Sequence, residues 1–255
     1  MTTTNELKPL LKRLRLGYLL NTLPERLTLA RRDQLDYAAF LEIILADEVT
    51  RRDNRNVEIH LQQAGFEEVC RLEDFDWTAS ITVDRRLLDA VFSLDFMHRH
   101  EHVLLVGPVG VGKSFLSQAL GYAAVRAGYS VRFIRADAFF RTLAQSRVDH
   151  TLEKTFRSFI SPDLLILDDF GLQKLTSGQS TDLYELIIAR HRKSSLVVTS
   201  NRAVDEWLGL FDDPILGNSA LDRLANSSYQ ITIEGTSYRE KLSPHRRKEV
   251  LTANN

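Results

Sequence analysis

The chain has 255 residues, 44% of them hydrophobic and 26% charged, so it is long enough for one large domain, or a large and a small one, around a real core. Twelve glycines and six prolines exclude the collagen-like and low-complexity classes. The 33 basic and 34 acidic residues give a net charge of −1, which excludes a global attraction to nucleic acid and restricts polyanion binding to local patches.

The lone cysteine, Cys70, cannot form an internal disulfide, and its neighbours lack the Cys and His spacing of a zinc site. The first 20 residues carry five charged side chains and no apolar stretch like that of a signal peptide. No later segment approaches about 18 uninterrupted apolar residues. We therefore expect a reduced, cytoplasmic protein with no membrane partner.

The first part of the chain has apolar residues at helical spacing, and residues 5–70 predict three or four helices. Its charge is uneven, because residues 1–32 contain seven Lys or Arg and two Glu (+5), whereas residues 33–80 contain four Arg and twelve Asp or Glu (−8). Residues 73–77, EDFDW, have the character of a polar connector with two aromatic anchors. We expect a small all-α N-terminal domain over residues 1–75 and a second domain over residues 76–255.

From His102 onward, short β-type runs alternate with longer helical runs. The expected strands cover residues 103–106, 131–134, 164–167, 196–199 and 229–233. These runs are apolar on both faces, as in strands covered by helices on both sides. The pattern predicts an α/β fold with a parallel five-stranded sheet sandwiched by helices.

The segment after the first expected strand reads GPVGVGKS and matches the phosphate-loop pattern GxxxxGK[ST], with a helical run directly after it. Glycines allow successive backbone N–H groups to face a phosphate at a helix N-terminus, Lys113 reaches the β- and γ-phosphates, and the Ser114 hydroxyl ligates Mg²⁺. The predicted cofactors are therefore ATP and Mg²⁺. The predicted nucleotide-binding residues are Gly107, Pro108, Val109, Gly110, Val111, Gly112, Lys113, Ser114 and Phe115.

A second element, LLILDD at residues 164–169, has four apolar residues followed by two acids and is typical of a Walker B strand. Asp168 is expected to hold Mg²⁺ through water, and Asp169 to orient the attacking water. A pair of merely solvated acids is the alternative. DFG at residues 169–171 also matches a kinase motif, but the other kinase motifs are absent from the sequence.

Two further residues are candidates for catalysis. Asn201 follows the fourth expected strand, at the sheet edge where ligands of α/β proteins bind, and is expected to position the lytic water. Arg223 stands in an otherwise apolar helical run and is expected to be an arginine finger for a neighbour's γ-phosphate. A turn-forming Ser-Asn pair and an ion pair between Arg223 and Asp222 are the alternatives.

The motifs GPVGVGKS, LLILDDFG, VVTSN, ALDRL and GTSYRE occur in this order after a helical region, and together they resemble the IstB/DnaC group of AAA+ ATPases. The N-terminal segments LKRLRL and LDYAAFL, with EVTRR and FDW, resemble IstB in particular, the helper ATPase encoded beside an insertion-sequence transposase. The resemblance covers residues 5–242. It implies an AAA+ ATPase domain over residues 76–255 without a sizeable C-terminal lid.

The resemblance also implies the activity and the partners: a Mg²⁺-dependent ATPase that forms an ATP-dependent homo-oligomer on duplex DNA and recruits the cognate transposase. Arg223 would match the family's arginine finger, and Arg239 a sensor-2-like position. The second acid is Asp169, where many AAA+ ATPases have Glu, so slow hydrolysis is expected. A DnaC-like helicase loader, a small-molecule kinase and a non-hydrolysing nucleotide switch are the alternatives.

Candidate DNA contacts come from clusters of basic residues, because contacts to phosphates bind DNA without reading its sequence. Lys8, Lys12 and Arg15 are spaced i, i+4, i+7 and are expected to lie on one face of a basic amphipathic helix. A solvated helix face is the alternative. The other candidates are Arg51, Arg52, Arg147 and Lys154.

Overall fold

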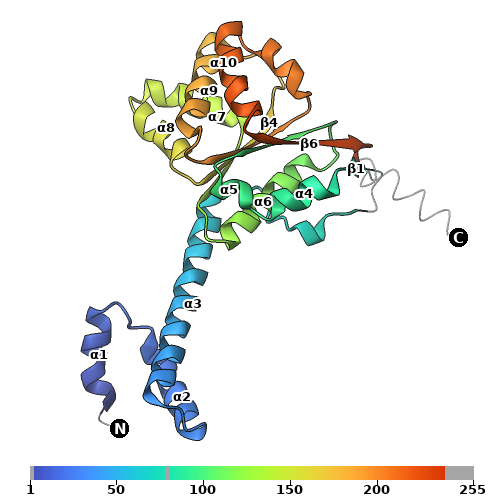
Figure 1. Ribbon diagram of the computed structural model, residues 1–255. Coiled ribbons are helices and arrows are strands. Elements are labelled where there is room, and N and C mark those ends of the chain that lie inside the picture. Colours follow the sequence, from blue (N-terminus) through green and yellow to red (C-terminus); the bar gives the residue numbers. More distant parts are fainter. Residues whose placement is uncertain (1–2, 78–80, 239–255) are drawn as a thin grey trace, which may run out of the picture. The chain divides into compact units, whose positions relative to one another are not determined.

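The computed structural model describes residues 3–77 and 81–238 (Figure 1). The chain forms two compact units, Met1–Ile59 and His60–Asn255. The first unit contains helices α1 (Thr3–Arg13), α2 (Leu19–Arg32) and most of α3 (Tyr37–Ala64), which continues into the second unit. Its small core consists of Leu19, Leu23 and Ile44. The sequence predicts three or four helices here, and the described residues form three.

The end of α1 corrects one expectation. The helix ends at Arg13, and Arg15 has a left-handed backbone with φ 59°. Arg15 therefore does not continue the helical face that carries Lys8 and Lys12. Its carbonyl oxygen instead accepts a hydrogen bond from the Arg52 guanidinium at 3.0 Å.

The second unit is built on a six-stranded sheet in the order β1-β6-β2-β5-β4-β3. Five strands are parallel, as the sequence predicts: β2 (His102–Val106), β3 (Val131–Arg135), β4 (Leu164–Phe170), β5 (Ser195–Ser200) and β6 (Ser228–Gly235). The sixth strand, β1 (Ile81–Val83), pairs antiparallel with β6 and corrects the expected number of five. Three residues are too few to give a periodic signal in the sequence.

Helices cover both faces of this sheet (Figure 1). One face carries α4 (Arg85–Phe92), α5 (Asp95–His98) and α6 (Lys113–Arg126). The other carries α7 (Ala136–Val148), α8 (Leu152–Ile160), α9 (Ser177–Arg190) and α10 (Pro214–Ala225), with the short 3-10 helix η2 (Val204–Leu210). Among the described residues, no helix is both long and apolar enough to cross a membrane.

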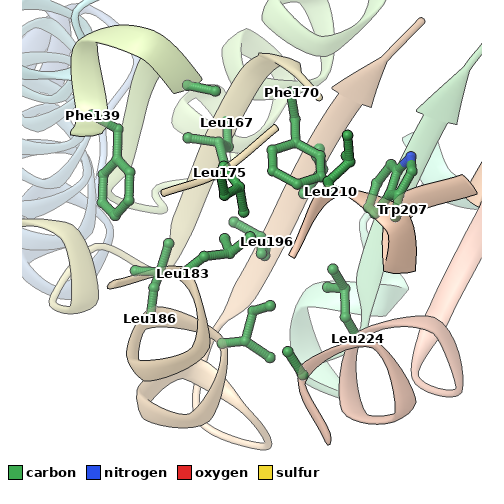
Figure 2. Close-up of a cluster of buried hydrophobic side chains, with 14 of the residues drawn as sticks. Phe139, Leu167, Phe170, Leu175, Leu183, Leu186, Leu196, Trp207, Leu210 and Leu224 are labelled. Carbon is green, nitrogen blue, oxygen red and sulfur yellow. The ribbon is translucent and has the colours of Figure 1, made fainter. Parts of the chain in front are cut away.

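The core explains why the central strands are apolar throughout. Leu167 and Leu196 pack against α7, α9 and α10 in the cluster that Figure 2 shows. Ile166, the neighbour of Leu167, points to the opposite face, where a Cβ added to Gly121 of α6 would lie 2.7 Å from its Cδ1. Both faces of β4 are therefore buried.

The boundary between the two units differs from the expected one at residues 75 and 76. Residues 60–77 belong to the second unit, where the 3-10 helix η1 (Leu72–Asp74) lies. The Phe66 ring lies 6.3 Å from that of Phe133, and the Phe75 ring lies 5.4 Å from that of Phe115. These aromatic contacts attach the connector to the sheet and to α6.

Candidate nucleotide-binding site

The loop between β2 and α6 has the backbone that a phosphate loop requires. Gly107, Gly110 and Gly112 have φ values of 151°, 84° and 96°. A Cβ at Gly107 would overlap the Ile233 carbonyl oxygen, and one at Gly110 would overlap the Ser237 side chain. The loop therefore needs glycine at these positions both for its conformation and for its packing.

Lys113 begins α6 and is 5% exposed. Its ammonium group donates to the carbonyl oxygens of Gly107 at 2.8 Å and Pro108 at 2.6 Å. These contacts hold the cation beside the loop, at the N-terminus of a helix, where backbone N–H groups and the helix dipole favour an anion.

The two acids of β4 are brought together by an irregularity in the sheet. Leu167 pairs with Val198 and Phe170 with Ser200, so Asp168 and Asp169 lie opposite a single residue, Thr199. Consecutive side chains of a regular strand point to opposite faces. This bulge, with Asp169 at φ 55°, re-aims the second carboxylate.

Thr199 fixes this bulge with both functions of its hydroxyl group. The hydroxyl donates to Asp168 Oδ1 at 2.6 Å and accepts from the backbone N–H of Asp169 at 2.9 Å. On the other side, the Ser114 hydroxyl donates to Asp168 Oδ2 at 2.9 Å. The phosphate-loop serine and the first acid are therefore in direct contact.

The electrostatics of the two acids differ. Burial raises the pKa of Asp168, while its hydrogen bonds to Thr199 and Ser114 oppose this rise and the nearby Asp169 adds to it. Asp169 is more exposed, and its Oδ2 lies 3.6 Å from Nη1 of Arg135, the last residue of β3. The positive charge of Arg135 at this place offsets part of the electrostatic repulsion between the two carboxylates.

A cavity of about 440 Å³ joins these groups. One part is lined by residues 109–115 of the phosphate loop and by Asp169 and Asn201. The rest is lined by Asp74, Phe75, Asp76, Ile81, Leu172 and Tyr238. Its size lies in the usual range for small-ligand pockets, about 300 to 1,000 Å³.

The aromatic part of the cavity is tied to the phosphate loop. A Cβ at Gly112 would lie 2.6 Å from the Phe75 ring, and the backbone N–H of Tyr238 donates to the Gly110 carbonyl at 2.9 Å. An apolar, aromatic wall beside a phosphate-binding loop suits a base attached to a chain of phosphates.

The donor set fits Mg²⁺ as well. A hydroxyl group and a carboxylate lie 2.9 Å apart at Ser114 and Asp168, with the second carboxylate next to them. Mg²⁺ prefers oxygen ligands and is usually held by one or two carboxylates together with substrate phosphates. Ser114 and Asp168 are the residues that would hold it.

Most of the predicted site residues come together here, but Arg223 does not. Asn201 lines the cavity because β5 lies between β2 and β4. Arg223, in contrast, is on α10, five residues before β6 begins, and its Nη1 donates to the carbonyl and hydroxyl oxygens of Ser219 at 2.6 Å. Arg239 lies outside the described residues.

Three contributors were not singled out from the sequence. Thr199 lies within the VVTSN motif, and its polar side chain at the end of a buried strand was an available signal. Arg135 and Phe75 reach the site through tertiary contacts, for which the sequence holds no local signal.

Three of the seven basic residues expected to contact DNA are held by ion pairs. Glu48, 3% exposed, accepts from Arg51 and Arg52, and these guanidinium groups lower its pKa to about 2 against the effect of burial. Arg147 pairs with the buried Asp182. Lys154 is exposed on α8.

The fold and the site define a P-loop nucleotide-binding protein of the AAA+ class. The family described as "IstB-like ATP binding protein" matches residues 9–246. The chain belongs to this family.

Relatives that match over nearly their whole length support this assignment. An ATP-binding protein of an insertion sequence in Mycobacterium tuberculosis is 39% identical over 241 residues, which cover 94% of this chain and 96% of that protein. The ATP-binding protein of insertion sequence IS21 of Pseudomonas aeruginosa is 35% identical over 250 residues, covering 98% and 94%.

Solved structures share the fold at lower identity. AMPPCP-bound DnaA from Aquifex aeolicus has a TM-score of 0.55 and 21% identity, covering 72% of this chain and 56% of that one. DnaI has a TM-score of 0.54 and 19% identity, covering 64% and 90%. At this identity the likeness concerns the fold alone.

Proposed function

We propose that the protein is a Mg²⁺-dependent ATPase that assembles on duplex DNA and helps the transposase of its insertion sequence to select and use target DNA. The observation that carries the ATPase activity is the bulge at Asp168 and Asp169. Thr199 of β5 holds this bulge, and Ser114 joins it to the phosphate loop. ATP would supply the γ-phosphoryl group, and Mg²⁺ held by Ser114 and Asp168 would neutralise the charge that develops on it.

In this proposal each residue has a separate task. Lys113 and the loop glycines bind the β- and γ-phosphates, and Ser114 and Asp168 hold the metal ion. Asp169 orients and polarises the attacking water, and Asn201, at the end of the neighbouring strand, positions the same water. Arg135 places a positive charge 3.6 Å from the Asp169 carboxylate.

We propose that Arg223 acts on the nucleotide of a neighbouring copy. The phosphate loop follows the carboxyl end of β2, while Arg223 precedes the amino end of β6, which is parallel to β2 and pairs His102 with Ser228. A five-residue strand separates the two edges by roughly 16 Å, at about 3.3 Å per residue. An arginine side chain does not span this distance, which supports action in trans.

The role in transposition is supported by the relatives, whose names assign them to insertion sequences as ATP-binding proteins. Duplex DNA and the transposase of the same element are the partners we propose. The exposed Lys8 and Lys12 on α1, and Lys154 on α8, are the proposed DNA contacts that lack a competing ion pair among the described residues.

Mixing two inactive variants tests the shared site. Arg223→Ala and Asp169→Asn should each bind ATP but hydrolyse it slowly, Arg223→Ala by about 10³-fold or more, the range of arginine fingers. A mixture should regain activity, because some interfaces pair an intact Asp169 with an intact Arg223. The matched control is Arg192→Ala, an exposed arginine at the same edge of the sheet, which should keep wild-type turnover.

Two results would contradict the proposal. Co-assembled mixtures that never exceed either parent would remove the shared site, and full turnover in Asp169→Asn would move the catalytic role elsewhere. The DNA part is tested separately: wild-type protein with ATP should bind duplex DNA and stimulate target joining by the purified transposase, whereas protein with ADP should do so weakly.

A further inference from the structure

A second hollow, of about 370 Å³, lies on the second unit outside the nucleotide site. Three elements form it: the last turns of α3 with His60 and Gln63, the start of β3 with Ser130 and Arg132, and the end of α8 with Ser158 and Ser161. The start of β3 is the amino edge of the sheet, so this hollow and the phosphate loop belong to opposite edges.

Arg132, which lines this hollow, differs from the nearby arginines in its partners. Its guanidinium carbon lies 4.4 Å from the centroid of the Phe159 ring, and burial lowers its pKa. Within the described part of the chain it makes no hydrogen bond and no ion pair. The neighbouring arginines on β3, α7 and α8 each pair with a carboxylate; they are Arg135, Arg141, Arg147 and Arg157.

The other residues that line the hollow carry no negative charge. Lys154, Ser158 and Ser161 are spaced i, i+4, i+7 and therefore share one face of α8 and its end. The buried Nδ1 of His60 has no hydrogen-bond partner among the residues that the structure describes. Arginine, lysine, hydroxyl and amide groups are the usual partners of backbone phosphates in protein–DNA interfaces.

Asp163, which follows the lining residue Pro162 in the sequence, already accepts hydrogen bonds. The carboxylate of Asp163 accepts from the backbone and the hydroxyl of Ser130, at 2.8 and 2.7 Å. The guanidinium of Arg190, which is fully buried, donates to the backbone carbonyl oxygens of Pro162 and Asp163. Arg190 offsets the charge of Asp163, so Arg132 and Lys154 leave the hollow positive.

We propose that this hollow binds a phosphate group of the DNA backbone, with the Arg132 guanidinium as its anchor and Lys154 beside it. The assignment of the phosphate to DNA rests on the proposed function. A guanidinium held over an aromatic ring is pre-oriented, so it loses little conformational freedom when it binds an anion. Contacts of this kind hold DNA of any sequence, as a protein that accepts many targets requires.

The test compares Arg132→Met with Arg157→Gln. Methionine keeps an apolar side chain over Phe159 but removes the charge, and Arg157 is an exposed arginine on the same helix that is already paired with Glu153. Duplex affinity is measured by fluorescence anisotropy over a series of KCl concentrations with AMPPNP present. ATP affinity and ATPase activity without DNA serve as controls of folding.

We expect Arg132→Met to bind DNA about tenfold more weakly, with the slope of log affinity against log salt reduced by about 0.9, and Arg157→Gln to match the wild type. Ser161→Glu, which places a negative charge at the exposed rim without changing the core, should weaken binding similarly. Wild-type slope and affinity in Arg132→Met, or an equal loss in Arg157→Gln, would overturn the proposal and leave the proposed function intact.

A second arm separates DNA from free phosphate. If wild-type protein binds no duplex at all, the proposed DNA function fails, and the Nε–H NMR signal of Arg132 is followed in Lys113→Ala protein as inorganic phosphate is added. A saturable shift that His60→Ala weakens would support an anion site for a small phosphate. No shift would overturn the site itself.

Discussion

Thr199 offers the sharpest test of how the two acids are held. Thr199→Val keeps the shape of the side chain but removes the hydroxyl that donates to Asp168 and accepts from the N–H of Asp169. A hydrogen bond to a charged group contributes about 1.5–3 kcal/mol, and an unsatisfied buried N–H costs about 1–3 kcal/mol. Because the bulge can relax in part, we expect the free energy of unfolding to fall by about 2–4 kcal/mol.

The catalytic effect of the same change should be separable from its effect on binding. The hydrogen bonds of the Thr199 hydroxyl go to Asp168 and Asp169, so ATP affinity should stay within about threefold of the wild type. The rate of single-turnover hydrolysis should fall by more than tenfold, because Asp169 loses the contact that fixes its backbone. A tenfold fall corresponds to a rise of about 1.4 kcal/mol in the activation free energy.

Thr199→Ser retains the hydroxyl and provides the matched control. Stability is followed by tryptophan fluorescence during urea unfolding, because both tryptophans, Trp77 and Trp207, lie in the second unit. Wild-type turnover in Thr199→Val, or an equal loss in Thr199→Ser, would refute the argument that the hydroxyl holds the bulge.

Two further predictions concern the loop and the amino edge of the sheet. Lys113→Ala should weaken ATP binding by at least about tenfold, as expected for the loss of a charge-assisted phosphate contact; unchanged affinity by calorimetry would contradict the site. Burial and the charge of Arg190 lower the pKa of His102 to about 4, from 6.5. The unfolded chain therefore takes up a proton below about pH 6.5 that the folded chain binds only near pH 4, and stability should fall by about 3 kcal/mol over this window. His102→Asn, which keeps an acceptor for the Leu196 N–H, should flatten the pH dependence of the urea midpoint between pH 4 and 6.5; an unchanged slope would show that another group titrates.

The parts of the site that could be predicted depend on local sequence. The phosphate loop is contiguous, and its glycines and Lys113 act through backbone conformations that eight residues determine together. The apolar run before the two acids of β4 predicts that they lie at the end of a buried strand. The five parallel strands follow from apolar runs, because burial on both faces leaves a signal in each strand.

The other parts depend on pairings between distant segments. In the bulge, Thr199 of β5 lies opposite two residues of β4, so the bulge depends on how the two strands pair. No feature of residues 164–169 alone predicts it. The arginines at positions 51 and 52 form a basic cluster in the sequence, but in the fold they stabilise a buried carboxylate at Glu48. A cluster of basic residues therefore predicts an exposed binding surface only where the fold places no buried acid within reach of these side chains.

The direction of the sheet has a consequence for assembly. All five central strands run the same way, so the phosphate loop, Asp169 and Asn201 gather at the carboxyl edge, while Arg223 belongs to the amino edge. If Arg223 completes a neighbour's site, the amino edge of one copy must meet the carboxyl edge of the next. Such a contact uses two different surfaces, and repeating it produces a ring or an open helix rather than a closed twofold dimer. Each added copy would then bring one Arg132 hollow, so the number of phosphate contacts, and with it the salt dependence of DNA binding, should grow with the length of the assembly.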